Sequence, residues 1–373
     1  MTTEQTAVQT LPHKPQRIAV IPGDGIGREV AEVGVDVLKA IAERFDLAFD
    51  FEWLPLGAEH YLTTGETLTD EMFEHLRDDC DAIFFGAMGD PRVPDMKHAK
   101  DILLGLRFRL ELYVNLRPIR LMHPEMTPLK RKREEDLDFV IFRENTEGLY
   151  VGLGGNFKRD TPDEIAINEM LNTRKGVERV IRAAFEWADR HQKRRVCMSD
   201  KANVLSYAHG LWQRVFKLVA AEYPHIEARH LYADVLAMEM VRAPEDFDVI
   251  VTSNMFGDIL SDLGAELVGG LGLAASANLN PGKVSLFEPV HGSAPDIAGK
   301  DVANPLAMVL TGALMLNALG HAEAGAFLEE RVARLLKRGE VTADLRRSLG
   351  QDEEGALSTR AVGEALIELI RQP

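Results

Sequence analysis

Short apolar runs alternate with longer amphipathic segments along most of the chain. Runs rich in β-branched and aromatic residues, typical of strands, are RIAVIP (17–22), DAIFFG (81–86), DFVIF (138–142), RRVCMS (194–199) and DVIVTS (248–253). Segments with helical spacing follow at 27–45, 203–223 and 257–268. This rhythm predicts an α/β fold with a mostly parallel twisted sheet flanked by helices. Functional groups are then expected at the carboxyl ends of the strands.

Two further segments complete the expected architecture. PLAMVLTGALMLNAL (305–319) is apolar all round but shorter than the roughly 20 residues that span a bilayer, so we expect a buried helix. The Gly/Ala-rich run 269–280 is typical of a close-packed crossing between two halves of a molecule.

Composition narrows the class of protein. With 373 residues, 46% of them hydrophobic, the chain can form one large or two medium globular domains. The net charge of −16 disfavours nucleic acid and anionic membranes as partners. Cys80 and Cys197 have no CxxC spacing, which predicts neither a disulfide framework nor a thiolate zinc site. Residues 1–15 show no signal or transit peptide and are expected to be a frayed tail of a cytoplasmic protein.

Three arginines could recognise an acidic ligand. They are Arg107 in LLGLRFR, Arg117 in NLRP and Arg143 in FREN. A guanidinium fork can donate two parallel hydrogen bonds to a carboxylate. In a helix over 101–110, Leu103 and Arg107 share a face with Leu104 at its side, which could hold an aliphatic branch. Taken by spacing alone, core leucines and paired surface arginines are the commoner interpretation.

Candidate metal and base residues follow two of the predicted strands. Asp258 and Asp262, after DVIVTS, lie four apart on one helix face and could offer hard oxygen ligands to Mg²⁺ or Mn²⁺. Lys201, after RRVCMS, could act as a base near such an ion. A solvated acidic face and a solvent-facing lysine are the commoner explanations of either feature alone.

Two glycine-containing loops could approach a ligand closely. IPGDGIG (21–27) joins a strand to a helix, but its glycine spacing is not GxGxxG, so a structural turn is the default interpretation. FEPVHGSAPDIAGK (287–300) is rich in Gly, Ala, Pro and Ser and suits a nucleotide lying against backbone. His291, taken by itself, would more often be structural.

Together and in this order, IPGDGIG, NLRP, RENTEG, GDILSD and FEPVHGSAPDIAG resemble the isocitrate/isopropylmalate dehydrogenase family, from about Arg17 to the C-terminus. The resemblance implies a non-Rossmann, two-domain isopropylmalate dehydrogenase-like fold. Residues 1–112 and 269–373 would form a large domain with the cofactor loop. Residues 113–268 would form a small domain with the dimer interface, metal and base residues. The active site would lie between them and be shared within a homodimer.

The resemblance also implies individual roles. Arg107, Arg117 and Arg143 would bind the substrate carboxylates, and Leu103 and Leu104 an aliphatic branch. Mg²⁺ or Mn²⁺ would be held by Asp258 and Asp262 with Asp234 from the neighbouring subunit. Lys201, also from the neighbour, would be the base, and Tyr150 the acid that protonates the enol. Residues expected to contact the cofactor are Ile26, Glu288, His291, Gly292, Ser293, Ala294, Asp296, Ile297 and Asn304.

Cofactor and substrate follow from a few positions. Asp296 would accept hydrogen bonds from ribose hydroxyls and repel a 2′-phosphate, which favours NAD over NADP. By the same resemblance, leucines at the positions of Leu103 and Leu104 are typical of family members that act on 3-isopropylmalate, so the expected reaction is its oxidation and decarboxylation to 2-oxoisocaproate in leucine biosynthesis.

Two departures from the isopropylmalate pattern leave alternatives open. Asn145 and Glu147 of RENTEG are more similar to the tartrate/D-malate, homoisocitrate and isocitrate branches. Arg28 stands where the family usually has proline, at a helix start where the loss of proline should cost little. A non-catalytic regulatory subunit is a further alternative, against which the joint presence of Lys201, Tyr150, Asp258 and Asp262 argues.

Overall fold

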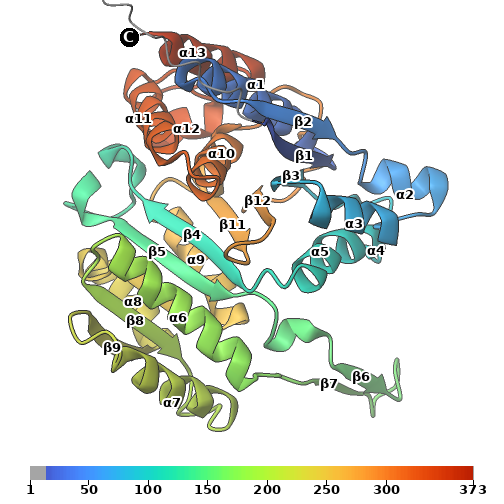
Figure 1. The fold of residues 1–373 in the computed structure, drawn as a ribbon, viewed down its shortest axis with the longest axis vertical. Helices are drawn as coiled ribbons and strands as arrows, with labels where there is room; N and C mark the ends of the chain where they lie inside the picture. The colour runs from blue at the N-terminus through green and yellow to red at the C-terminus, as the bar shows by residue number, and fades with distance from the viewer. Residues whose placement is uncertain (1–13, 373) are drawn as a thin grey trace, which may run out of the picture.

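A ten-stranded sheet forms the centre of the protein (Figure 1). The computed structural model describes residues 14–372, so the tail expected at 1–15 falls almost wholly outside the described residues. The strand order is β2-β1-β3-β12-β11-β4-β5-β10-β8-β9. The strands are β1 Gln16–Gly23, β2 Phe49–Trp53, β3 Ala82–Ala87, β4 Val114–Arg120, β5 Asp138–Glu144, β8 Arg195–Asp200, β9 Glu227–Tyr232, β10 Val249–Thr252, β11 Ala275–Leu279 and β12 Ser285–Pro289.

The sheet has two parallel wings and an antiparallel middle. Strands β2, β1, β3 and β12 pair in parallel, as do β5, β10, β8 and β9. Between the wings, β12, β11, β4 and β5 pair antiparallel. The prediction of a mostly parallel sheet with flanking helices is confirmed. The Gly/Ala-rich run at 269–280 contains β11, whose pairing with β4 joins the two wings.

Helices cover the sheet along its length. The longer helices are α1 Gly27–Phe45, α3 Asp70–Asp78, α6 Arg174–Arg190, α7 Ala208–Ala220, α8 Ala233–Arg242, α9 Asn254–Glu266, α10 Leu306–Ala318, α11 Ala322–Arg338 and α13 Thr359–Arg371. The shorter helical segments are α2 Ala58–Thr64, α4 Lys97–Ala99, η1 Lys100–Leu104, α5 Gly105–Arg109, η2 Pro124–Met126, η3 Glu134–Asp136, η4 Leu149–Val151, η5 Pro244–Asp246, η6 Leu271–Leu273 and α12 Ala343–Ser348. No helix within residues 14–372 is long and apolar enough to cross a membrane.

In the wing formed by β2, β1, β3 and β12, successive side chains point to opposite faces of the sheet, and each face packs into a hydrophobic core. Ile18, Val20 and Phe84 face one way, in the same cluster as the buried residues of α1 and α10. Ala19 and Ile21 point to the other face, where they lie in a cluster with residues of α3 and α5. Because successive side chains in a strand point to opposite faces, strands buried on both sides are apolar throughout.

The predicted helix boundaries hold to different degrees. The helix expected at 27–45 is α1, and the buried helix expected at 305–319 is α10, Leu306–Ala318. The helix expected at 203–223 begins only at Ala208. Residues 201–207 instead form turns, in which the amides of Val204 and Leu205 both donate to the carbonyl of Lys201. Local sequence pattern cannot separate such a turn from the first turn of a helix.

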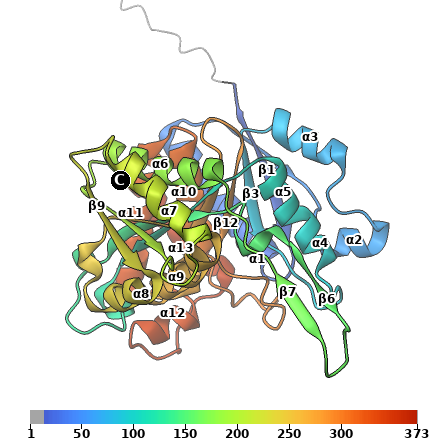
Figure 2. The same cartoon turned by 90° about the horizontal axis from the view of Figure 1, so that it is seen from below.

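A two-stranded hairpin, β6 Gly154–Phe157 with β7 Ile165–Asn168, projects from the body in both views (Figures 1 and 2). Every residue of both strands is exposed, including Phe157 at 61% and Ile165 at 52%. An isolated two-stranded hairpin with apolar residues in water is only marginally stable.

Candidate active site

Asp258 and two arginines form the centre of the candidate site. Arg117 lies on β4, and Arg143 lies near the end of β5. Asp258 lies in the first turns of α9, in contact with both arginines. Helix α9 approaches closely because Gly257 has no side chain. A Cβ at that position would lie 2.5 Å from Cγ of Arg143. Packing therefore requires the glycine of the GDILSD segment, because a side chain there would collide with Arg143.

The carboxylate of Asp258 receives three donors. Arg143 Nη1 donates to Oδ1, Arg117 Nη2 lies 3.5 Å from the same oxygen, and the Tyr150 hydroxyl donates to Oδ2 over 2.9 Å. Asp262, one turn further along α9, lies with its Oδ1 3.3 Å from Arg117 Nη1. The structure thus brings together five predicted site residues from β4, β5, η4 and α9.

Burial shapes the charges of this cluster. It lowers the pKa of Arg117 and lowers that of Arg143 to about 10, because the charged forms lose hydration. Both guanidiniums still carry a positive charge at neutral pH. Burial, and then the Asp258 carboxylate, raise the pKa of the Tyr150 phenol, which keeps its proton in place. The cluster therefore offers two fixed cations and one proton donor around two carboxylates.

Arg107 belongs to a second, adjoining network. Its Nη2 donates to Glu288 Oε1 over 2.7 Å, and the amide of Asn278 donates to the same oxygen over 2.8 Å. Asn278 Oδ1 accepts from the amides of Asn115 and Asn145 over 3.0 and 2.8 Å. Asn115 Oδ1 in turn accepts from Arg117 Nε over 2.7 Å. One hydrogen-bonded line therefore connects Arg107, through Glu288, to Arg117.

Sequence reasoning did not assign Asn115, Asn278, Asn254 or Ser261 to the site. Asn254 Oδ1 accepts from Nε and Nη2 of Arg143, and Ser261 Oγ lies 2.6 Å from Nη1 of Arg117. Asn115, Asn254 and Ser261 each accept from a buried guanidinium, where an unpaired donor would be costly. These three lie close in sequence to the motif arginines and aspartates, whereas Asn278 lies in the Gly/Ala-rich run and carried no such signal.

Lys201 and Asp234 form a separate pair. Lys201 Nζ donates to Asp234 Oδ1 over 2.5 Å, and neither side chain bonds to the arginine cluster among residues 14–372. The Lys201 side chain lowers the pKa of the Asp234 carboxyl. The backbone of Lys201 is held by His209, whose Nδ1 accepts the Lys201 amide over 2.8 Å. His209 is fully buried and was also missed by sequence reasoning.

The donor set for a hard divalent cation is incomplete in one chain. Asp258 and Asp262 supply carboxylate oxygens, the ligands that Mg²⁺ and Mn²⁺ prefer. Within residues 14–372, Asp258 and Asp262 belong to no group of three His, Cys, Asp or Glu side chains whose ligand atoms all lie within 4.8 Å of one another. The pair fits a divalent cation that takes further oxygens from substrate, water or a second chain.

The cofactor loop expected at 287–300 packs against the glycine turn. The amide of Ile26 donates to the Ser293 carbonyl over 2.9 Å, and a Cβ at Gly25 would lie 2.0 Å from the same oxygen. Pro295 and Gly299 border a cavity of about 420 Å³ that Gly25 and Asp24 also line. His291 Nε2 is buried without a hydrogen-bond partner, an acceptor or donor that a bound nucleotide could satisfy.

The remaining predicted cofactor residues lie along the same loop. Asp296 is exposed and Ile297 half-buried, and the Asn304 amide donates to Asp344 over 3.3 Å. Gly292 and Ala294 flank Ser293, and Ala294 has a φ of 39°. Glu288, at the end of β12, touches Arg107 rather than lying on the loop itself.

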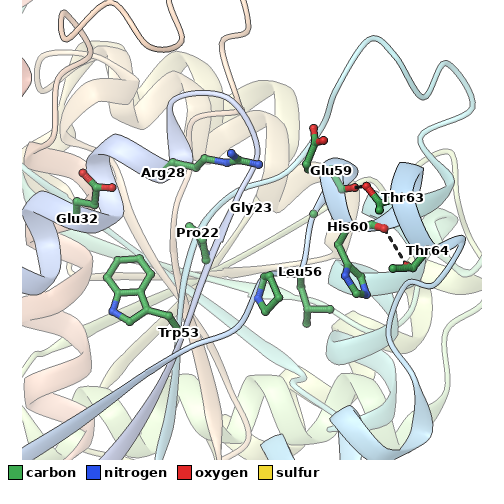
Figure 3. Close-up of a pocket in the computed structure, with 12 residues that line it drawn as sticks. Pro22, Gly23, Arg28, Glu32, Trp53, Leu56, Glu59, His60, Thr63 and Thr64 are labelled. Carbon is green, nitrogen blue, oxygen red and sulfur yellow. Dashed lines mark hydrogen bonds between the residues drawn. The ribbon is translucent and has the colours of Figure 1, made fainter.

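Another cavity, of about 460 Å³, is lined in part by Pro22 and Gly23 of the glycine turn (Figure 3). Pro22, Trp53 and Leu56 supply apolar walls, and Arg28 and His60 are among its polar residues. None of the residues predicted for catalysis, metal or cofactor binding lines it. The chemistry-bearing side chains gather elsewhere.

Comparisons with known proteins agree with this geometry. The 3-isopropylmalate dehydrogenase of Thermobifida fusca (strain YX) is 50% identical over 323 residues, 86% of this chain and 91% of that protein. The 3-isopropylmalate dehydrogenase of Frankia casuarinae is 48% identical over 322 residues, 86% of this chain and 92% of that protein. The crystal structure of isocitrate dehydrogenase from Methylococcus capsulatus superposes with a TM-score of 0.85 at 37% identity, covering 96% of this chain and all of that one. The sequence profile described as isocitrate/isopropylmalate dehydrogenase matches residues 17–366, and the chain therefore belongs to this family of decarboxylating dehydrogenases.

Proposed function

We propose that the protein oxidises 3-isopropylmalate with NAD and decarboxylates it to 2-oxoisocaproate, a step of leucine biosynthesis, with Mg²⁺ or Mn²⁺ as the metal. The observation that carries this proposal is the pairing of Asp258 and Asp262 with Arg117 and Arg143. It places cation-binding oxygens directly beside carboxylate-binding guanidiniums. A 2-hydroxy acid needs both, because its hydroxyl must be polarised while its carboxylates are held.

The choice of substrate depends on the helical segment before Arg107. Ile102 and Leu106 are buried in the core, whereas Leu103 and Leu104 remain partly exposed on the segment that leads to Arg107. Two accessible leucines beside a carboxylate-binding arginine suit an isopropyl branch. A third carboxylate there would lose hydration without gaining a cation.

The residues of the chain can supply each proton transfer. Lys201 would take the proton of the substrate hydroxyl, and Tyr150 would give its proton to the enol carbon after CO₂ leaves. The raised pKa of Tyr150 supports the second role, because the phenol stays protonated until the enol needs it. When bound, the divalent cation would favour loss of the hydroxyl proton and stabilise negative charge on the enolate oxygen.

The NAD preference rests on the exposed carboxylate of Asp296. At the loop beside the cavity of about 420 Å³, it can accept hydrogen bonds from ribose hydroxyls and would repel a 2′-phosphate. The buried, unpartnered His291 Nε2 supports placing the adenosine on this loop.

A homodimer with shared active sites accounts for three observations. Within the described residues Lys201 and Asp234 pair with one another and make no hydrogen bond to Asp258, so a second chain would have to bring them to its site. The β6–β7 hairpin is exposed on all residues. Apolar side chains also lie exposed on α8 and α9, with Met238 at 63% and Ile259 at 59%. Such surfaces mark protein interfaces.

The proposed domain boundaries are supported by the sheet order. Residues 1–112 and 269–373 contain β1, β2, β3, β11 and β12, and residues 113–268 contain β4, β5, β8, β9 and β10 of the same sheet together with the separate β6–β7 hairpin. Within the ten-stranded sheet, the two sets of strands occupy opposite ends without mixing. A cytoplasmic location stays a prediction.

A substrate panel tests the proposed reaction. We expect NADH formation with Mn²⁺ to be fastest with 3-isopropylmalate among that acid, D-malate, tartrate, isocitrate and homoisocitrate. The similarity to the crystal structure of an isocitrate dehydrogenase and the RENTEG segment make isocitrate and D-malate the critical comparisons. A dominant rate with any other acid would overturn the substrate, and no NADH with any acid would revive the regulatory alternative.

Complementation tests the shared site. Lys201→Met and Asp258→Asn homodimers should each be inactive. After unfolding and refolding together, half of the dimers would be mixed, each with one intact site, so about one quarter of wild-type activity should return. No recovery would mean that both groups act from the same chain.

A further inference from the structure

Three side chains with different donor atoms meet at the edge of the sheet. Glu52 lies on the edge strand β2, His75 on α3, and Cys80 just after α3. One ligand atom from each lies within 4.8 Å of the other two. Across residues 14–372 this is the one group of three or more His, Cys, Asp or Glu side chains that meets this condition.

A fourth residue fixes the orientation of the histidine. Asp79 Oδ2 lies 3.0 Å from His75 Nδ1, while His75 Nε2 lies 2.9 Å from Glu52 Oε2. If Asp79 holds the proton on Nδ1, the lone pair of Nε2 faces the Glu52 carboxylate. Two acceptors at that distance repel, so either a second proton or a cation must lie between them. A carboxylate behind a histidine is the usual outer partner of a metal-binding imidazole.

We propose that Glu52, His75 and Cys80 bind one zinc ion, with Asp79 as the positioning residue behind His75. One thiolate, one imidazole and one carboxylate match the ligands that zinc takes, and a water would complete four-coordination. The sulfur ligand disfavours Mg²⁺ and Mn²⁺, which prefer oxygen. This site is thus chemically distinct from the Asp258 and Asp262 pair.

Exposure of the three groups suits entry of an ion from solvent. The Cys80 residue is 8% exposed, whereas the His75 and Glu52 side chains are 28% and 38% exposed. Burial raises the pKa of the Cys80 thiol to about 11, so binding must release the thiol proton to solvent as the sulfur–zinc bond forms. The bound ion would join edge strand β2 to α3 and to the chain entering β3.

The lack of CxxC spacing predicted no thiolate zinc site, because such sites usually contain paired cysteines. The site proposed here contains one cysteine, and its other ligands are a histidine and a glutamate. Only folding brings together ligands that are 23 and 5 residues apart.

A protonated His75 is the competing state. The pKa of His75 is raised by its hydrogen bonds to Asp79 and Glu52, and an imidazolium could hold both carboxylates without an ion. The two states differ in whether Cys80 becomes a ligand, which gives the experiment its readout.

The test uses Co²⁺ as a spectroscopic substitute for zinc on the chelator-treated full chain. We expect a thiolate-to-cobalt charge-transfer absorption that saturates at one ion per chain and is displaced by zinc. Cys80→Ser should abolish it, and the matched Cys197→Ser, at the other buried cysteine, should retain it. Asp79→Asn should weaken cobalt binding about 10- to 100-fold without removing the absorption.

Two further variants keep the outcome unambiguous. His75→Gln provides a second test in case Cys80→Ser fails to fold. This variant keeps the Cys80 thiol but removes the imidazole ligand, so the absorption should weaken. Asp258→Asn should leave it unchanged, since the proposed catalytic cation site contains no sulfur. No charge-transfer absorption in the wild-type chain at millimolar Co²⁺, or its persistence in Cys80→Ser, would overturn the zinc site while leaving the proposed dehydrogenase activity unaffected.

Discussion

Arg107 and Glu288 form an ion pair between α5 and the end of β12, with 2.7 Å between Nη2 and Oε1. The two side chains are only 12% and 9% exposed, so the pair is well shielded from water. It couples the proposed substrate-binding helix to the strand that leads into the proposed cofactor loop. Besides its proposed role in binding a substrate carboxylate, Arg107 therefore neutralises Glu288.

Arg107→Lys should lower kcat/KM for the acid substrate about 30-fold, because lysine keeps the charge but loses the planar fork. This corresponds to about 2 kcal/mol for a hydrogen bond to a charged group. The measurement is steady-state kinetics with 3-isopropylmalate varied at saturating NAD. Arg109→Lys is the matched control on the same helix, where Arg109 pairs with exposed Asp70. Equal losses in both variants would contradict the role of Arg107.

Asn278→Ala should destabilise the protein by about 2–4 kcal/mol. The variant leaves the buried amides of Asn115 and Asn145 without their shared acceptor, and each unsatisfied group costs about 1–3 kcal/mol. Urea unfolding measures the change. Asn280→Ala, which removes one partly buried hydrogen bond to the Leu110 carbonyl, should cost less. A loss for Asn278→Ala no larger than for Asn280→Ala would show that the network contributes little.

Lys201→Met should nearly abolish turnover while leaving NAD affinity unchanged, since Lys201 is proposed to take the hydroxyl proton. Product formation and NAD binding by calorimetry are measured on the same preparation. Turnover close to wild type would place the base elsewhere.

Asp296→Lys combined with Ile297→Tyr should shift cofactor preference from NAD towards NADP. The substitution replaces a carboxylate that repels a 2′-phosphate with a cation that attracts it. The ratio of kcat/KM for the two cofactors is the readout. An unchanged ratio would locate the determinant outside this pair.

Acidification should destabilise the protein through His209. Burial lowers the pKa of His209 below its ordinary value of 6.5. Between the lowered value and 6.5, the unfolded chain therefore binds a proton at His209 and the folded chain does not. The stability that neutral His209 contributes is therefore present above about pH 6.5 and is lost as the pH falls through the depressed value. Protonation of Nδ1 would also break the bond from the Lys201 amide.

His209→Asn supplies the control, because an asparagine oxygen can accept the same amide without titrating. The free energy of unfolding should fall less steeply between about pH 7 and about pH 5 in this variant than in wild type. Parallel curves would mean that His209 titrates normally in the folded chain.

The sequence alone determined the class of fold and predicted the charged residues of the candidate site. Apolar periodicity predicted α1 at 27–45 and the buried helix near 305–319, because these patterns are local. The resemblance carried by the motif segments also implied that Arg117, Arg143, Tyr150, Asp258 and Asp262 would serve one site, and the structure brings all five together.

Only the tertiary structure decided the strand order, the antiparallel middle of the sheet and the groups that complete each cluster. Asn278 lies 163 residues from Asn115, and Glu288 lies 181 from Arg107. The resemblance implied one site for Lys201, Asp234 and Asp258, but within one chain Lys201 pairs with Asp234 and neither bonds to Asp258 among residues 14–372. Contacts between residues so far apart in the sequence arise from packing. Periodicity and local motifs do not indicate which distant side chains will satisfy a buried charge.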